Sequence, residues 1–210
     1  MGLLPVATLA WQKWVFVKLL RQGPSELPQL RDLDLSNLHW VERRHYTLDC
    51  NWKVFIDNYL DGGYHVPHLH HGLNDALDYS NYTIENGERF CLQSSPIVKD
   101  KAGDRALYYW IYPNFMINWY EGAMDTNLVI PRGIDKTEVI FDFYFAGGAD
   151  EASIAASERI QDEDVAICKS VQRGLASRAY TAGRLSARRE AGEHLFHRLL
   201  HADLKSGSDG

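Results

Sequence analysis

The chain has 210 residues, a formal net charge of −6, and hydrophobic and charged fractions of 45% and 24%. These values are typical of a soluble globular protein that can bury a sizeable core. The negative charge argues against nucleic acid or an anionic membrane surface as a partner. The 3 cysteines are widely spaced, which argues against a disulfide framework and indicates a reducing compartment, the cytoplasm or a plastid stroma.

The N-terminal segment, residues 3–20, is apolar but contains lysines, which are costly inside a bilayer. It also lacks the basic start and the polar cleavage boundary of a signal peptide. We therefore expect two short strands, Ala7–Trp11 and Trp14–Lys18, and no membrane span. Residues 22–38 mix glycine, proline, serine and charged residues, which predicts a linker.

The main domain is expected over residues 39–204, with a polar tail at 205–210. Hairpins that precede long helices are typical of the α+β class. The expected strands are His39–Thr47, short strands around Thr83 and Phe90–Leu92, a long aromatic strand Ala106–Tyr120 in which Pro113 marks an edge or bulge, and a hairpin of Asn127–Pro131 with Thr137–Phe145. The expected closing helices are Glu151–Thr181 and Ala187–Leu204.

A short amphipathic helix is expected after Asn51, a residue type favoured at the N-cap. Its apolar residues recur with helical spacing. Asp57 and Asp61 lie on a neighbouring face one turn apart, where a carboxylate can accept the ring N–H of a metal-binding histidine. The apolar stripe consists of Trp52, Phe55, Ile56, Tyr59 and Leu60.

Two histidines, His65 and His70, follow this helix five positions apart. Gly62 and Gly63 weaken the helix and Pro67 disfavours helical geometry before it, so both imidazoles can converge on one point. Two imidazoles suit zinc, copper, iron or nickel, and a carboxylate would complete the facial triad of non-haem iron oxygenases. Spacing alone also allows His68 or His71 in place of His70.

Asp164 is the carboxylate that helical periodicity places on the buried face of the first closing helix. An ionised carboxylate buried there needs a partner, which is either an arginine or a metal ion. The apolar stripe of this helix consists of Ile160, Ile167, Cys168, Val171 and Leu175, with Cys168 expected as a small buried residue.

Residues 58–67, which read Asn-Tyr-Leu-Asp-Gly-Gly-Tyr-His-Val-Pro, together with His70 resemble the iron-site motif of Rieske oxygenase α subunits, most closely the choline monooxygenase type. Residues 110–118 resemble the pocket-lining strand of that family. Residues 161–175 resemble its third-ligand helix. The likeness covers roughly residues 5 to 200, and it implies a helix-grip fold in which an antiparallel sheet wraps around a long C-terminal helix.

The resemblance also implies a site and an activity. Mononuclear Fe(II) would be held by His65, His70 and Asp164, while Asn58 and Asp61 would orient ligands or pass electrons. The reaction would be hydroxylation of a small organic substrate with dioxygen, such as choline or another N-methyl compound. Electrons would come from a separate Rieske protein or ferredoxin and an NAD(P)H reductase, and family members are often homotrimers. The expected substrate pocket includes Trp110, Phe115 and Trp119.

The sequence departs from the family pattern in two respects. It has no Cys-x-His and Cys-x-x-His pair, so the ligands of a [2Fe–2S] cluster are absent and residues 1–21 resemble only the last strands of a Rieske domain. This predicts a fragment, an incomplete gene model or a subunit supplied with electrons by another protein. Many family members also carry a carboxylate three positions before the first histidine ligand, where this chain has Gly62.

Two other functions remain open at this point. The pocket could serve a non-catalytic ligand-binding module or pseudoenzyme, which the missing cluster motif favours. Two histidines and an aspartate would also suit a zinc-dependent hydrolase.

Further clusters have simpler interpretations. His194, His197 and His201 share one helical face opposite an apolar one, which predicts a solvated stripe. The aromatic residues of segment 108–120 form a sheet core in the first instance. Strand alternation lets only half of them face a pocket, where some could form a cage for a quaternary ammonium group.

Overall fold

The computed structural model describes residues 6–18, 33–63, 77–97, 105–177 and 179–206. The chain divides into two units, residues 1–36 and 37–210. In the first unit, β1 (Ala7–Trp11) and β2 (Trp14–Lys18) form an antiparallel hairpin, which confirms both expected strands. The rings of Trp11 and Trp14 stack 5.4 Å apart beside the turn. The assignment of residues 1–21 to a Rieske-type remnant stays a prediction.

The second unit contains a seven-stranded antiparallel sheet in the order β3-β9-β8-β7-β6-β5-β4. Strands that follow one another in the chain are neighbours, except that β3 pairs with β9 at one edge. The α+β prediction is therefore confirmed. The strands are β3 (His39–Leu48), β4 (Thr83–Asn86), β5 (Phe90–Pro96), β6 (Arg105–Ile111), β7 (Phe115–Tyr120), β8 (Ala123–Pro131) and β9 (Thr137–Phe145).

The long aromatic strand expected over Ala106–Tyr120 is wrong in one respect, because it is two strands that fold back on each other. The chain turns between Ile111 and Phe115, with Pro113 in the turn. Proline cannot donate to a strand ladder, and Asn114 stabilises the turn by donating from Nδ2 to the carbonyl of Val129 at 2.6 Å.

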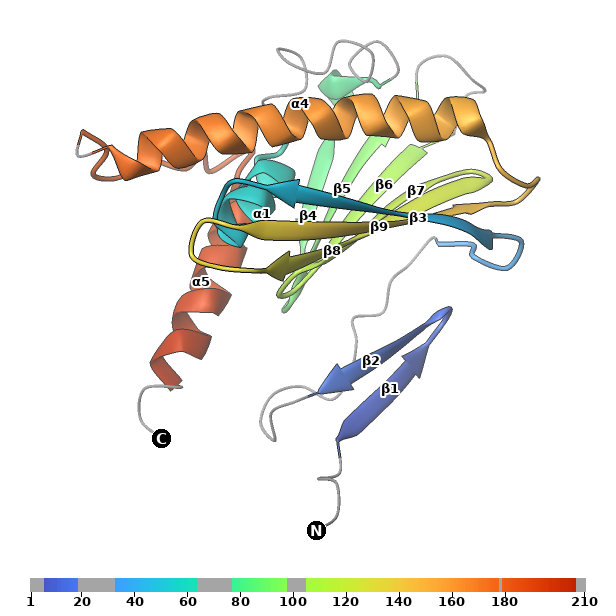
Figure 1. Cartoon of the computed structure of the whole chain (residues 1–210), viewed down its shortest axis with the longest axis horizontal. Coiled ribbons are helices and arrows are strands. Elements are labelled where there is room, and N and C mark those ends of the chain that lie inside the picture. The colour runs from blue at the N-terminus through green and yellow to red at the C-terminus, as the bar shows by residue number, and fades with distance from the viewer. Residues whose placement is uncertain (1–5, 19–32, 64–76, 98–104, 178, 207–210) are drawn as a thin grey trace. The chain divides into compact units, whose positions relative to one another are not determined.

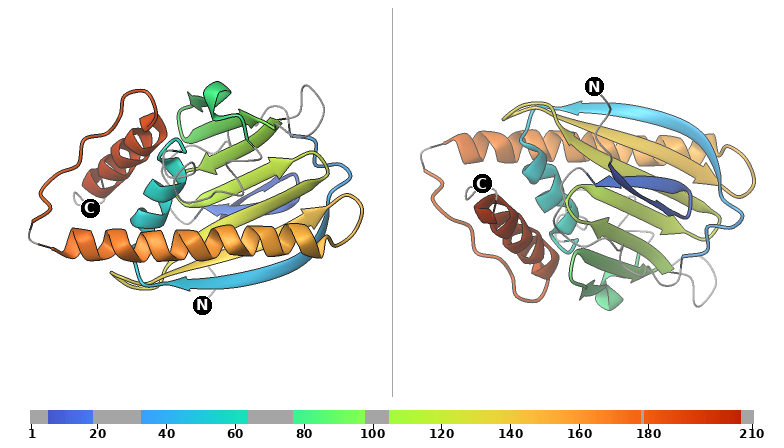
Figure 2. Two further views of the ribbon diagram at one scale, coloured as in Figure 1. Left: turned by 90° about the horizontal axis from the view of Figure 1, so that it is seen from above. Right: turned by 90° about the horizontal axis from the view of Figure 1, so that it is seen from below.

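Three α-helices and a short 3-10 helix complete the described part of the second unit: α1 (Trp52–Leu60), α4 (Glu151–Ala176), α5 (Ala191–Ser206) and η1 (Tyr79–Asn81). Helix α4 runs across one face of the sheet, and α1 lies at one end of that face, where it contacts both α4 and α5 (Figures 1 and 2). This is the expected helix-grip arrangement. The last helix begins at Ala191 rather than at Ala187, and none of the described helices is long and apolar enough to cross a membrane.

The core lies where the sheet meets α1 and α5. Ile56 and Leu60 from α1, Trp110 from β6 and Phe196 from α5 are almost completely buried. The rings of Trp110 and Phe196 meet edge to face with centroids 5.6 Å apart. Burial of such side chains stabilises a fold by roughly 2 kcal/mol each, so this core fixes α1 against the sheet.

Candidate functional site

Helix α1 forms where its N-cap and apolar stripe predicted. The side chain of Asn51 accepts a hydrogen bond from the backbone N–H of Lys53 at 3.1 Å, which satisfies one of the free donors of the first turn. Phe55, Ile56 and Leu60 are buried, as expected for the core-facing stripe. The opposite side of α1 presents polar side chains to α4 and α5.

Helices α1 and α4 are joined by polar contacts at both ends of α1. The Nδ2 of Asn58 donates to Oδ1 of Asp164 at 2.8 Å. The backbone N–H of Asn51 donates to Oε1 of Gln172, also at 2.8 Å. Because the earlier residue of α1 meets the later residue of α4, the two helices are antiparallel, and Asn58 orients the Asp164 carboxylate.

Asp61 and the glycines after it end helix α1. Asp61 accepts a hydrogen bond from the backbone N–H of Gly63 at 2.8 Å. Gly62 and Gly63 have φ angles of 67° and 76°, a left-handed conformation that favours glycine. A side chain at Gly62 would also collide with the backbone carbonyl of Arg189. This explains locally why position 62 is a glycine and not a carboxylate.

The two predicted histidine ligands, His65 and His70, lie outside the described residues, as do His68 and His71. Their convergence on one point therefore stays a prediction. Asp164, the third predicted ligand, is half-buried on α4 and lines a cavity, and Asn58 lines the same cavity.

This cavity has a volume of about 760 Å³ and lies between the sheet and helices α1 and α4. Its wall is rich in tyrosines contributed by α1, the segment before β4, and strands β6 and β7. Burial raises the pKa of each of these phenols, so they are uncharged near neutral pH. They are Tyr59, Tyr79, Tyr82, Tyr108 and Tyr120.

Trp110, Phe115 and Trp119, the residues expected to line the pocket, do not line this cavity. Trp110 is completely buried against Phe196. Phe115 and Trp119 alternate along β7 with Asn118 and Tyr120, and it is the latter pair that faces the cavity. From the same segment, Tyr108, Asn118 and Tyr120 line the cavity. Which of these side chains meet a substrate stays a prediction.

A polar network crosses the floor of the cavity. Oδ1 of Asp125 on β8 accepts from Nδ2 of Asn118 at 2.8 Å and from Nδ2 of Asn127 at 2.9 Å. The hydroxyl of Tyr59 donates to Oδ1 of Asn118 at 2.8 Å. Burial raises the pKa of Asp125 to about 6, although both amide hydrogen bonds favour the ionised form. Sequence patterning missed this network, whose only signal is a run of polar residues inside a strand.

Gln161 on α4 also lines the cavity and is 2% exposed. Within the described part of the chain its amide nitrogen has no hydrogen-bond partner. Buried donors are normally satisfied, so this one is suited to an acceptor atom on a bound molecule.

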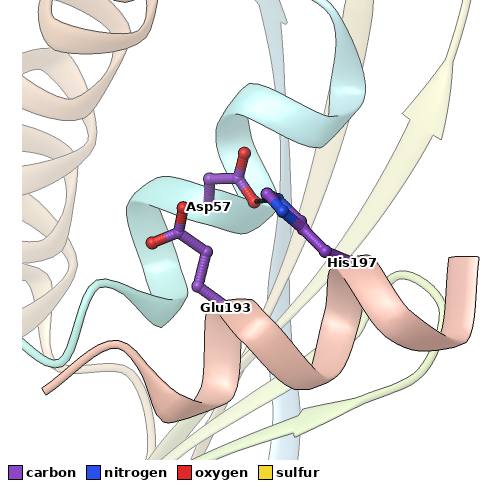
Figure 3. A group of neighbouring side chains, drawn as sticks. All are labelled: Asp57, Glu193 and His197. Atoms are coloured by element: carbon purple, nitrogen blue, oxygen red, sulfur yellow. Dashed lines mark hydrogen bonds and ion pairs between the residues drawn. The ribbon is translucent and has the colours of Figure 1, made fainter. Parts of the chain in front are cut away.

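A second group of polar side chains lies on the other side of α1, where Asp57 faces Glu193 and His197 of α5 (Figure 3). The Nε2 of His197 lies 2.8 Å from Oδ1 of Asp57, and one ligand atom from each of the three residues lies within 4.8 Å of the others. The hydrogen bond to Asp57 raises the pKa of His197. Burial, followed by the charges of Asp57 and Glu190, raises the pKa of Glu193 to about 8.

The expected solvated stripe on α5 is confirmed, because His194, His197 and His201 are all exposed. The sequence did not reveal that His197 pairs with Asp57, a residue of a different helix 140 positions away. The pair attaches α5 to the helix that precedes the predicted metal ligands.

Comparison with known proteins shows the family to which the chain belongs. Residues 35–93 and 81–206 match the family model described as "Ring hydroxylating alpha subunit (catalytic domain)". The chain is 43% identical to a chloroplastic choline monooxygenase of Arabidopsis thaliana over 98% of this chain and 56% of that protein. It is 27% identical to the carnitine monooxygenase oxygenase subunit of Escherichia coli K12, over 94% of this chain and 61% of that protein.

Solved structures show the same fold. A quaternary ammonium Rieske monooxygenase in complex with an inhibitor superposes with a TM-score of 0.70 at 26% identity, over 79% of this chain and 50% of that one. The same enzyme with L-carnitine gives a TM-score of 0.76 at 23% identity, over 94% of this chain and 60% of that one. The chain thus spans little more than half the length of the relatives it matches.

Proposed function

Because the chain belongs to the ring-hydroxylating alpha-subunit family, through that family's catalytic domain, we propose that it is an oxygenase component with a mononuclear iron site that hydroxylates a small quaternary ammonium compound. The observation that carries the proposal is the hydrogen bond between Asn58 and Asp164. It joins the helix that leads into the histidine motif to the carboxylate selected by helical periodicity, at the wall of the cavity.

His65, His70 and Asp164 would hold Fe(II). Imidazole nitrogens and a carboxylate oxygen form the ligand set of the facial triad, which leaves positions open for dioxygen and substrate. Asp164 fits this role, because its carboxylate lies at the cavity wall and one oxygen is already oriented by Asn58. Bound iron would supply the dioxygen chemistry, and the chain's own side chains would position ligands and substrate.

The lining of the cavity is suited to a substrate with a methylated ammonium group. Tyrosine rings attract such cations through their π faces, and Tyr79, Tyr82, Tyr108 and Tyr120 provide these rings on the cavity wall. The amide of Gln161, which has no hydrogen-bond partner among the described residues, would donate to an oxygen of the substrate, such as the hydroxyl of choline. Relatives named for choline and carnitine oxidation are consistent with this class.

Electrons would come from separate proteins. A [2Fe–2S] protein, either a Rieske protein or a ferredoxin, and an NAD(P)H reductase are the proposed donors. Asp61, at the end of α1, is the proposed bridge between the cluster and the iron. We also propose that residues 1–21 are the end of a Rieske-type domain, that residues 22–38 link it to the catalytic domain at 39–204, and that the subunits form a homotrimer.

The test is metal analysis and oxygen uptake. Protein purified without oxygen should contain close to one iron per chain, and a supplied ferredoxin and reductase should drive choline-dependent oxygen uptake. Zinc in place of iron would contradict the proposal and favour a hydrolase. Choline binding without oxygen uptake under these conditions would favour a non-catalytic ligand-binding module, the function suggested by the absence of cluster motifs in the sequence.

A further inference from the structure

A buried carboxylate on the cavity wall has no basic partner among the residues that the structure describes. Asp125 lies in β8, is 9% exposed and lines the cavity. Both of its side-chain hydrogen bonds come from neutral amides, those of Asn118 and Asn127, and both reach Oδ1. Within the described part of the chain, no lysine, arginine or histidine forms an ion pair with it.

The surroundings of Asp125 are aromatic as well as polar. Asn118 of β7 is paired in register with Asp125 on one side and with Tyr108 of β6 on the other, so these side chains point to the same face of the sheet. Tyr120, two positions along β7 from Asn118, also lines the cavity, and burial followed by the nearby charge of Asp125 raises its pKa. A cation in this part of the cavity would meet a carboxylate and tyrosine rings together.

Retaining an ionised carboxylate in such a place is costly unless a positive charge compensates it. The other charged residues of the cavity wall do not place a compensating positive charge inside the cavity. Arg159 and Glu163 are exposed on α4, and Asp164 carries a negative charge of its own.

We propose that Asp125 supplies the negative charge that holds the cationic end of the substrate, so that the site selects a cation over an uncharged molecule of the same shape. The inference rests on the proposed function for the class of substrate. A quaternary ammonium group has no N–H to donate, so its recognition depends on charge and on aromatic faces. Asp125 is in this sense a specificity-determining residue, and the two asparagines are positioning residues that hold its carboxylate.

The experiment compares two probes that differ in charge alone. Choline and 3,3-dimethylbutan-1-ol have the same shape, but the second replaces the ammonium nitrogen by carbon. Their binding to the full chain is measured by calorimetry without oxygen or electron donors. The wild-type chain should bind choline at least about tenfold more tightly than the neutral alcohol, given the strength of buried charge pairs.

Asp125→Asn should lose this preference, with choline affinity falling to that of the neutral alcohol and the affinity for the alcohol unchanged. Asp125→Glu keeps the charge and should restore part of the preference. Asp162→Asn removes the same charge from an exposed position of α4 and is the matched control. It should bind both probes as the wild type does.

Unchanged choline affinity in Asp125→Asn would overturn the proposal, as would a wild-type chain that binds the alcohol as well as choline or fails to bind choline. If Asp125→Asn does not fold, the wild-type chain still gives a test through its carboxyl carbon resonances. Choline should lower the pKa of Asp125, because a nearby cation favours the ionised form, and an unchanged pKa would overturn the proposal. Three tyrosines lie near enough to feel the charge of Asp125, and burial followed by nearby charges raises the pKa of each. They are Tyr46, Tyr59 and Tyr120, and they stay neutral over the pH range in which Asp125 titrates.

Binding alone is measured, so the oxygenase proposal and the charge proposal can fail separately. Absence of iron or of oxygen uptake, with the preference for choline intact, would contradict the oxygenase proposal and leave the charge proposal standing.

Discussion

Asn58 and Asp164 are 106 positions apart in the chain, yet Nδ2 of the first lies 2.8 Å from Oδ1 of the second. The bond crosses from α1 to α4 at the cavity wall. It gives the predicted third iron ligand a fixed orientation. Substitution of each of the two residues is therefore expected to have its own effect on iron binding.

Replacement of Asp164 by alanine should empty the metal site and leave the fold intact. The carboxylate is a proposed ligand, and two histidines alone form a weak site for Fe(II). Iron per chain after oxygen-free purification measures the effect, and circular dichroism checks the fold. Asp162→Ala on the exposed side of the same helix should retain full iron content. Full iron content in Asp164→Ala, accompanied by a loss of several kcal/mol of stability, would instead indicate a structural ion pair.

Asn58→Ala should weaken iron binding without abolishing it. Loss of a group that orients a metal ligand typically reduces affinity about 10–100-fold, and loss of the hydrogen bond should reduce stability by about 1 kcal/mol. Titration with Fe(II) under anaerobic conditions gives the affinity. Lys53→Ala, an exposed position on the same helix, is the control. An iron affinity equal to that of the wild type would mean that Asn58 does not position the ligand.

Gly62→Ala should destabilise the protein more than Gly122→Ala. Both glycines have positive φ angles, 67° and 78°, so both substitutions carry a comparable backbone penalty of roughly 1 kcal/mol. A Cβ at Gly62 would also meet the carbonyl of Arg189, whereas a Cβ at Gly122 has open space around it. Urea unfolding of the two variants measures the difference. Equal losses would show that the segment around Arg189 can move away without cost.

Removal of the Glu193 carboxylate should change how stability depends on pH. The pKa of Glu193 is raised to about 8 in the folded chain, from a usual value of 4.5. The folded state therefore holds this proton more tightly, and the resulting stabilisation is lost as the pH rises through 8. Chemical unfolding at pH 6.5 and pH 9 should show that the free energy of unfolding falls less for Glu193→Gln than for the wild type. Glu88→Gln, an exposed position, should decline as the wild type does.

The effect of Asp125→Asn on the free energy of unfolding should become more favourable as the pH rises. The pKa of Asp125 is about 6 when folded and 3.8 for an ordinary aspartate. The wild type thus loses stability as the pH rises through 6, because the buried carboxylate becomes ionised. Between pH 5 and pH 7.5 the difference in unfolding free energy between variant and wild type should shift by about 1 kcal/mol in favour of the variant. A difference that does not depend on pH would mean that Asp125 ionises as an exposed aspartate does.

The sequence alone determined the features that depend on local periodicity and capping. Asn51 caps α1, three residues of its apolar stripe (Phe55, Ile56 and Leu60) are buried, and the turn between β8 and β9 closes at Arg132 and Lys136 as expected. Helical spacing placed Asp164 on the side of α4 that lines the cavity, where it is half-buried, because 100° per residue is a property of the helix itself. The expected buried stripe of α4 was wrong at its C-terminal end, where Val171 and Leu175 are exposed. The α+β class follows from the same local patterns.

Tertiary structure decided which side chains meet. Trp119 and Asn118 are adjacent in β7, and the family resemblance pointed to the tryptophan as a pocket residue. Only the packing of the sheet against α1 and α4 determines which face of the strand lines the cavity. The pairing of Asp57 with His197 and the polar network around Asp125 join elements that are distant in the chain. Such contacts are set by the way strands and helices pack together, and no local pattern of residues encodes them.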